Sequence, residues 1–401
     1  MSKLVGRTPQ NSHFSGVPPG TFRIGSLHMH RGVREFIRWA EEQNGQHGIV
    51  LQPAAQSADL TTIEQEIGSP LPADLRLVLG RFNGAALPSG VLLTAAAGPG
   101  ATIDAALKEV AAQRESSFLD PDLLLPFART EHGSVLAFDR SAAPTSDTWP
   151  IVDFDPETGD LRLVHRTFDA WCRVQLNEWT SPDFRSPFTL DRYLAQGQRH
   201  ASVEPDVSVA HVTIGHAQRR AGQPEAALLG YLAGARCVPA EPWCDWEAIK
   251  LAVVLQDDNA VLEAGGRLGK RAPARKWALR GTTPSRVAFL VARAHNRTPR
   301  AESLPWQRIV DHLTLQALDD DDRHACESIR SSLGASELAQ PHPDQPVKVP
   351  RFDPPELWWD HLRAHYAAGA LRDDDLAMHP IYDSLAPAHS AAELLRIRRE
   401  F

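Results

Sequence analysis

The spacing of apolar residues changes along the chain, and each change predicts a different kind of structure. Near the N-terminus, apolar residues recur every three or four positions, which predicts a helix over 32–43 and a pair of short helices over 60–84. In that pair, Thr61 and Glu64 have the spacing of a capping box at a helix start, and Pro72 suits the first turn of the second helix. The pair is interpreted as scaffold, because none of its residues is suited to catalysis.

Four short apolar runs follow, reading DLLLPF, GSVLAF, WPIVDF and DLRLVH. Their length predicts strands of an antiparallel sheet, and the DPETG between the last two suits a hairpin loop. A helix opened by Thr167 is expected at about 168–179. Helices, then a sheet, then a helix predict an α+β domain, with helices packed on an antiparallel sheet, over residues 31–180.

Beyond this domain the apolar pattern is helical almost throughout. Two Ser-Pro dipeptides and one Glu-Pro dipeptide predict a connector over 181–205. The pattern over 206–340 predicts a mainly α-helical, repeat-like domain. A Pro-rich strip and C-terminal helices occupy 341–401, and residues 1–30 predict an irregular N-terminal arm. The chain has 401 residues, which is long enough for two separate cores.

Composition and charge narrow the class of protein. Hydrophobic residues make up 42% of the chain, and no apolar run approaches the roughly 20 residues of a membrane span. The first residues, MSKLVGRTPQNSHFSG, lack the apolar core of a signal peptide, which favours a cytoplasmic location. The four cysteines show no metal-binding spacing and predict reduced thiols. A net charge of −8 argues against general nucleic-acid binding.

One segment departs from this acidic average. From Arg267 to Arg300 the sequence contains ten basic residues and no Asp or Glu. The simplest interpretation is a helical face paired internally with later aspartates, and the alternatives are a docking face for an acidic protein or a nucleic-acid contact with Trp277 stacked on a base. The net charge favours a protein partner over nucleic acid. The candidate partner-binding residues of this segment are Arg271, Arg275, Lys276 and Arg280.

Asp153 and Asp155 form a D-x-D pair. On a loop, two carboxylates could hold a divalent cation. On a strand, both would lie on the solvent face while Phe154 points inward, and this interpretation is favoured. Both aspartates are kept as candidate partner-binding residues.

His361 and His365 share a helix face and could chelate zinc, but the sequence identifies no third ligand, so no metal and no cofactor are expected.

The motifs of common enzyme classes are absent from the sequence. The glycine-rich stretch from Gly265 to Lys270 lacks the spacing of a phosphate loop and the Ser or Thr that follows its lysine. No nucleophile elbow, zinc-protease helix or dinucleotide fingerprint occurs either. The sequence therefore predicts a protein that is not an enzyme.

The N-terminal domain resembles the SUKH superfamily, whose members include bacterial immunity proteins and yeast cell-wall regulators. The resemblance covers about 33–179, with its motifs in the order of the family. They are Ile63, Glu64 and Glu66 before Gly68; Leu71, Pro72 and Asp74; Phe82, Asn83 and Gly84; Leu125, Pro126 and Phe127; Gly133; Phe138 and Asp139; and 149–152, followed by the helix from Thr167. The resemblance implies a sheet and groove that bind another protein, without catalysis.

Residues 206–239 resemble a single tetratricopeptide repeat. Gly215 stands where the two helices of the repeat cross closely, Gly222 at the turn, and Ala227 and Tyr231 at packing positions of the second helix. One repeat cannot bury its own apolar face, so degenerate neighbours are expected to complete a small helical solenoid.

These resemblances lead to one hypothesis and one alternative. The hypothesis is a bacterial cytoplasmic immunity or regulatory protein that binds and neutralises a toxin or effector, possibly an acidic one. The alternative is a helical-repeat interaction scaffold with no toxin partner, in which the N-terminal domain regulates binding by the repeats.

Overall fold

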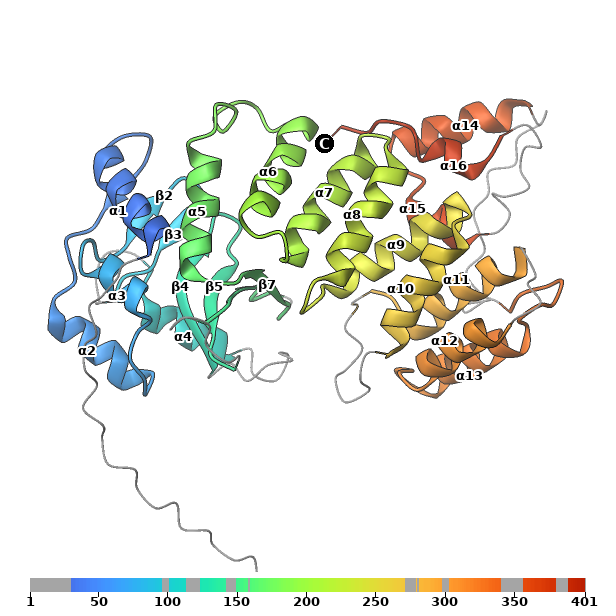
Figure 1. Ribbon diagram of the computed structural model, residues 1–401, viewed down its shortest axis with the longest axis horizontal. Helices are drawn as coiled ribbons and strands as arrows, with labels where there is room; N and C mark the ends of the chain where they lie inside the picture. Colours follow the sequence, from blue (N-terminus) through green and yellow to red (C-terminus); the bar gives the residue numbers. More distant parts are fainter. Residues whose placement is uncertain are drawn as a thin grey trace, which may run out of the picture.

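The computed structural model describes residues 30–95, 101–112, 123–141, 149–157, 159–270, 279, 281–297, 303–339, 356–379 and 389–400. Its N-terminal domain is built on a seven-stranded antiparallel sheet, in which the spatial order of the strands follows the chain (Figure 1). The strands are β1 (Val50–Leu51), β2 (Ala85–Leu87), β3 (Gly90–Leu92), β4 (Leu124–Thr130), β5 (Val135–Asp139), β6 (Ile151–Phe154) and β7 (Leu161–His165). The four strands predicted from apolar runs are β4 to β7, and the DPETG loop joins β6 to β7 as an antiparallel hairpin.

The described residues form five helices in the N-terminal domain and eleven in the helical half. Those of the N-terminal domain are α1 (Arg31–Gln43), α2 (Ser57–Glu66), α3 (Ala73–Leu79), α4 (Ile103–Ala112) and α5 (Phe168–Trp179). The helical half comprises α6 (Leu190–Val203), α7 (Ser208–Arg220), α8 (Pro224–Arg236), α9 (Pro242–Leu255), α10 (Asp258–Lys270), α11 (Pro284–Arg297), α12 (Leu304–Thr314), α13 (Asp320–Ser331), α14 (Glu356–Ala367), α15 (Asp373–Met378) and α16 (Ala391–Leu394). The predicted fold class, an α+β domain followed by a mainly helical region, is confirmed.

The predicted helix pair over 60–84 forms, but its boundaries were wrong. The helix α2 begins at Ser57, where Gln56 and Asp59 form the capping box. Thr61 lies inside α2 and donates its hydroxyl to the carbonyl of Ser57, while the Glu64 carboxylate accepts the backbone N–H of Leu71. A Thr and Glu at capping-box spacing therefore also suit a helix interior when their side chains have other partners.

The second helix of the pair was also misplaced by a few residues. Pro72 caps α3 and precedes its first turn, and the helix ends at Leu79 rather than near Asn83. The Asn83 side chain instead accepts the backbone N–H of Ala95, at 2.7 Å, which ties the turn to the chain after β3. Gly84 adopts a left-handed φ of 93°, as expected for a chain-reversing residue.

The two faces of the sheet pack against different helices. Phe127 of β4 lies 5.3 Å, between ring centroids, from both Phe168 and Trp171 of α5. On the opposite face, Val110 of α4 packs with a second cluster that includes Val135. Residues alternate between these faces along each strand, so α5 covers one side of the sheet and α4 the other.

Consecutive helices from α5 to α10 contact one another in chain order, and Figure 1 shows α5, α6, α7 and α8 side by side. The helix α6 occupies most of the predicted connector 181–205, and α7 also contacts β7. The helical stack therefore begins on α5, the closing helix of the sheet domain.

The helices α7 and α8 form the hairpin expected for a tetratricopeptide-like repeat. A Cβ atom at Gly215 would lie 2.5 Å from Cε1 of Tyr231, so the two helices cross too closely there for a larger residue. Ala227 and Tyr231 are fully buried in the core of the helical half. The positions taken from the repeat pattern thus have the packing roles that the resemblance implied.

The chain returns to this hairpin near its C-terminal end. The backbone N–H of Arg399 donates to the carbonyl of Arg220 at 2.8 Å. Arg396 pairs with Glu225 of α8, and Arg220 donates to the carbonyl of Glu400. Residues 396–400 therefore cover the turn between α7 and α8.

Candidate functional site

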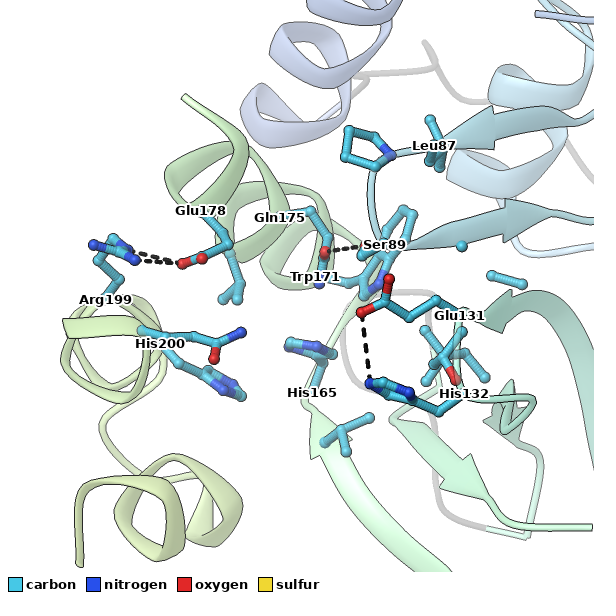
Figure 2. Close-up of a pocket in the computed structure, with 18 of the residues that line it drawn as sticks. Leu87, Ser89, Glu131, His132, His165, Trp171, Gln175, Glu178, Arg199 and His200 are labelled. Carbon is cyan, nitrogen blue, oxygen red and sulfur yellow. Dashed lines mark hydrogen bonds and ion pairs between the residues drawn. The ribbon is translucent and has the colours of Figure 1, made fainter. Parts of the chain in front are cut away.

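A cleft of about 480 Å³ lies where the sheet domain meets α6. Its walls are the β2–β3 turn, the β4–β5 turn, one face of α5 and one face of α6 (Figure 2). The residues that line this cleft include Ser89, Val91, Trp171, Phe188, Arg199 and His200.

Hydrogen bonds within the walls hold the cleft in shape. The Ser89 hydroxyl donates to Oε1 of Gln175 at 3.1 Å and so joins the β2–β3 turn to α5 (Figure 2). Arg199 of α6 donates twice to Oε2 of Glu178, at 2.9 and 2.6 Å, and also pairs with Asp183. These contacts fix α6 against α5, so the cleft is formed before any partner binds.

The cleft combines an apolar lining with polar groups that lack partners. Leu136, Val164 and Trp171 contribute apolar surface to its walls. Within the described part of the chain, Nε1 of Trp171 and Oγ1 of Thr130 are buried and make no hydrogen bond. Buried polar groups are normally paired, so these two favour a ligand that supplies the missing partners.

Two apolar side chains remain exposed at the rim. Phe188 keeps 52% of its surface exposed, and Val91 of β3 keeps 37%. The guanidinium carbon of Arg192 lies 5.6 Å from the ring centroid of Phe188, which positions the ring beside a charged group. An exposed aromatic ring beside an arginine is a common anchor for a protein partner.

At one end of the cleft, His165, His200 and Glu204 form a compact group, termed below the His–His–Glu cluster. Nδ1 of His165 lies 2.6 Å from Oε2 of Glu204, and Nε2 of His200 lies 3.4 Å from the same oxygen. The two imidazole rings stack with their centroids 4.8 Å apart. His165 ends β7, His200 lies on α6 and Glu204 caps the C-terminus of α6, so the cluster joins the sheet to the helical stack.

The protonation of the cluster follows from its burial. Burial lowers the pKa of His165, so this ring is neutral at pH 7 and donates its Nδ1–H to Glu204. Burial alone would raise the pKa of Glu204, but hydrogen bonds from His165 and the Arg166 backbone, together with the nearby His200 ring, hold it at about 2. The cluster thus contains an ionised carboxylate beside a neutral imidazole.

The two aspartates of the D-x-D pair have different surroundings in the structure, with Asp153 on β6 and Asp155 in the loop that follows. Phe154 is fully buried, as predicted, but Asp153 is half-buried rather than on an open solvent face. Asp153 stands between Leu136 of β5 and Arg162 of β7 in the strand register. Its Oδ1 is buried and has no hydrogen-bond partner among the described residues, and burial raises its pKa. Asp155 accepts the backbone N–H of Glu157 and so shapes the β6–β7 loop.

We expect Asp153→Asn to raise the free energy of unfolding by about 1 kcal/mol at neutral pH, because it removes a charge whose buried oxygen lacks a partner. The raised pKa of Asp153 means that the folded protein favours the protonated carboxyl, so wild-type stability is lost as pH rises from about 4 through the raised pKa. The gain from Asn should therefore shrink as the pH falls towards about 4. Urea unfolding at several pH values measures this.

The control for this prediction is Asp155→Asn. Asp155 accepts a backbone N–H in the loop, so its replacement should not produce a gain that grows with pH. A gain at Asp153 that is equal at pH 4 and pH 8 would contradict the assigned cause.

Three of the described basic residues of the segment 267–300 have partners inside the helical half, whereas Lys270 is exposed. Arg267 pairs with the fully buried Asp245 at 2.8 Å, and Arg293 donates to the carbonyl of Leu376 at 2.9 Å. Arg286 reaches Asp374, one of the later aspartates, at 4.0 Å. Of these three residues, Arg286 alone reaches one of the later aspartates, while Arg267 pairs with an earlier aspartate and Arg293 with a backbone carbonyl. The candidate residues Arg271, Arg275, Lys276 and Arg280 lie outside the described residues.

The histidine pair on α14 gathers no metal-ligand set in the described part of the chain. His365 is exposed and His361 is half-buried. Among the described residues, the group of three or more His, Cys, Asp or Glu side chains with metal-like spacing is the His–His–Glu cluster. Sequence reasoning missed this cluster, and the only local signal was the four-residue spacing of His200 and Glu204.

The N-terminal domain is therefore an α+β module with a cleft at its junction with the helical half. Residues 54–173 match the family model described as the SMI1 / KNR4 family (SUKH-1), which confirms the resemblance of this domain. The family supports a protein-binding role in general. A search of curated proteins found no match. In the described part of the chain, no helix has both the length and the apolar composition needed to span a bilayer.

Proposed function

We propose that this protein binds and neutralises a toxin or effector protein, and that the cleft receives a segment of this partner. The observation that carries the proposal is the combination of an apolar, preformed hollow with the unpaired Nε1 of Trp171 and the exposed ring of Phe188. A peptide carbonyl or carboxylate entering the cleft would accept from Trp171, while an apolar partner residue would cover Phe188. The family match to SUKH-1 supports a protein as the ligand.

We infer that the cleft binds its partner without catalysis. The charged groups of the wall are engaged with each other, as in the pairing of Arg199 with Glu178 and Asp183. Such ion pairs fix the shape of a binding surface before the partner arrives. This lowers the free-energy cost of binding, because fewer side chains have to be ordered and desolvated at that moment.

A second candidate function is the helical-repeat scaffold with no toxin partner. It is favoured by a further hollow, of about 840 Å³, between α10 and α12. Leu304 lines this hollow and keeps 54% of its surface exposed, and Lys270 and Arg308 add positive charge. A partner that binds there would leave the cleft free.

Affinity capture with the full chain, from cells that produce it, separates the two candidates. Phe188→Asp places a charge at the rim of the cleft and should weaken capture of the main partner by about 30-fold or more, the loss typical of an interface hot spot. Leu229→Asp is the matched control, because Leu229 is 69% exposed on α8, away from both hollows. Leu304→Asp tests the scaffold alternative in the same way.

The outcome also tests the nature of the partner. Expression of the captured protein alone should arrest growth, and co-expression with the wild type but not with Phe188→Asp should restore it. Loss of capture in Leu304→Asp alone, or a captured protein that is harmless, would favour the scaffold. Equal losses in Phe188→Asp and Leu229→Asp would contradict the cleft as the binding site.

A further inference from the structure

We propose that the His–His–Glu cluster binds one divalent transition-metal ion, with Zn²⁺ as the ion to be tested, at the junction of β7 and α6. Two imidazole nitrogens and one carboxylate oxygen form a common three-ligand set for zinc. Here the three donor atoms lie within 4.8 Å of one another. The proposal does not require that a toxin or effector protein is the partner bound in the cleft.

The distances need only small side-chain movements to accept the ion. Tetrahedral zinc with bonds of about 2.0 to 2.1 Å places its ligand atoms about 3.3 Å apart. Oε2 of Glu204 already lies 3.4 Å from Nε2 of His200 and 2.6 Å from Nδ1 of His165. Rotation of the two stacked rings about their Cβ–Cγ bonds would bring the nitrogens together around one ion.

The second observation is an unpaired ligand atom. Nε2 of His200 is buried and makes no hydrogen bond of good geometry with any described residue. Leaving a buried ring nitrogen without a hydrogen-bond partner destabilises the folded state. Coordination of a metal ion would use this lone pair and remove the cost.

The surroundings also suit a metal site. A carboxylate and a neutral imidazole are the forms of these side chains that bind metal. Coordination through Nδ1 of His165 would move its proton to Nε2, so the ring would stay neutral. The backbone N–H of Arg166 donates to Oε1 of Glu204 at 2.6 Å and orients the carboxylate, as outer partners do in metal sites.

The position of the cluster gives the ion an open side. His165 and His200 both line the cleft, and Figure 2 shows their rings directed towards it. A zinc ion with three protein ligands keeps a fourth position for water or for a donor from a ligand in the cleft. The bound ion would link the last strand of the sheet to the helical stack.

The test uses the full chain after removal of metals with a chelator. Titration with Zn²⁺, followed by calorimetry, should show one ion per chain. His200→Gln should weaken its affinity by more than about 100-fold, beyond the loss caused by removing an outer hydrogen-bond partner. Zn²⁺ should also raise the melting temperature of the wild type and leave that of His200→Gln unchanged. The matched control is the double variant His361→Gln with His365→Gln, which should bind as the wild type does.

A spectroscopic variant keeps the test independent of whether His200→Gln folds. With Co²⁺ in place of Zn²⁺, His200→Cys should show a sulfur-to-cobalt charge-transfer band that the wild type lacks, since the new thiolate would enter the coordination sphere. The proposal is overturned by a wild type that binds no Zn²⁺, by binding that His200→Gln leaves intact, by loss of binding in the α14 control, or by a His200→Cys protein without the new band.

Discussion

We expect Asp373→Ala to lower the free energy of unfolding by about 3 to 5 kcal/mol, because it leaves a buried guanidinium without its counter-charge. Oδ1 of Asp373 lies 2.5 Å from Nη2 of Arg219, whose side chain is only 4% exposed. The same oxygen accepts the Tyr366 hydroxyl at 2.5 Å and lies 3.4 Å from Nη2 of Arg399. The carboxylate therefore joins α7, α14, α15 and the C-terminal return in one ionic network.

Urea unfolding followed by circular dichroism measures this loss. The matched control is Asp321→Ala, because Asp321 also lies in the first turn of an acidic helix but is exposed. Its replacement should change the free energy of unfolding by no more than about 0.5 kcal/mol. Equal effects at the two positions would show that charge at the helix start, and not the buried pairing with Arg219, is what Asp373 contributes.

Gly90→Ala should destabilise the sheet domain by about 3 kcal/mol or more, through backbone strain and a direct clash. Gly90 has a φ of 147°, a conformation that residues with a side chain rarely adopt. A Cβ atom there would lie 2.0 Å from the carbonyl oxygen of Arg129 on the neighbouring strand. The β2–β3 turn would have to move away from β4, which would displace Ser89 from Gln175 and open the cleft.

The control for Gly90→Ala is Gly133→Ala in the β4–β5 turn. Gly133 also has a positive φ, of 92°, but nothing lies within 4 Å of its Cβ position. Its replacement should cost only about 1 kcal/mol of left-handed strain. Calorimetric unfolding of the two variants separates strain from clash, and similar losses in both would rule out the clash with β4.

The elements that the sequence predicted well are those with a recognisable length or cap. The apolar runs that became β4 to β7 form strands of four to seven residues, and the helix from Thr167 has its cap, whose hydroxyl accepts the N–H of Ala170. The strands β1, β2 and β3 span only two or three residues, so no alternation could reveal them. They form because β3 pairs with β4, β2 with β3 and β1 with β2, which is a tertiary effect.

The cleft and the His–His–Glu cluster could not be predicted from spacing. His165 and Glu204 are 39 residues apart and meet only because α6 folds back beside β7. The Ser-Pro and Glu-Pro dipeptides of residues 181–205 predict a connector, although Thr189 caps a helix of fourteen residues there. Proline marked the ends of this segment and gave no information about the helix between them.

The return of residues 396–400 to the α7–α8 turn determines when the first repeat can be completed during synthesis. Arg220 and Glu400 touch across 180 residues of sequence. At about 5 to 20 residues per second, a ribosome would need about 10 to 40 seconds to make the chain between them. During that interval the turn at Gly222, which later lies against the Arg396 carbonyl, stays uncovered. The turn is thus covered by residues that are translated after all the described helices of the helical half.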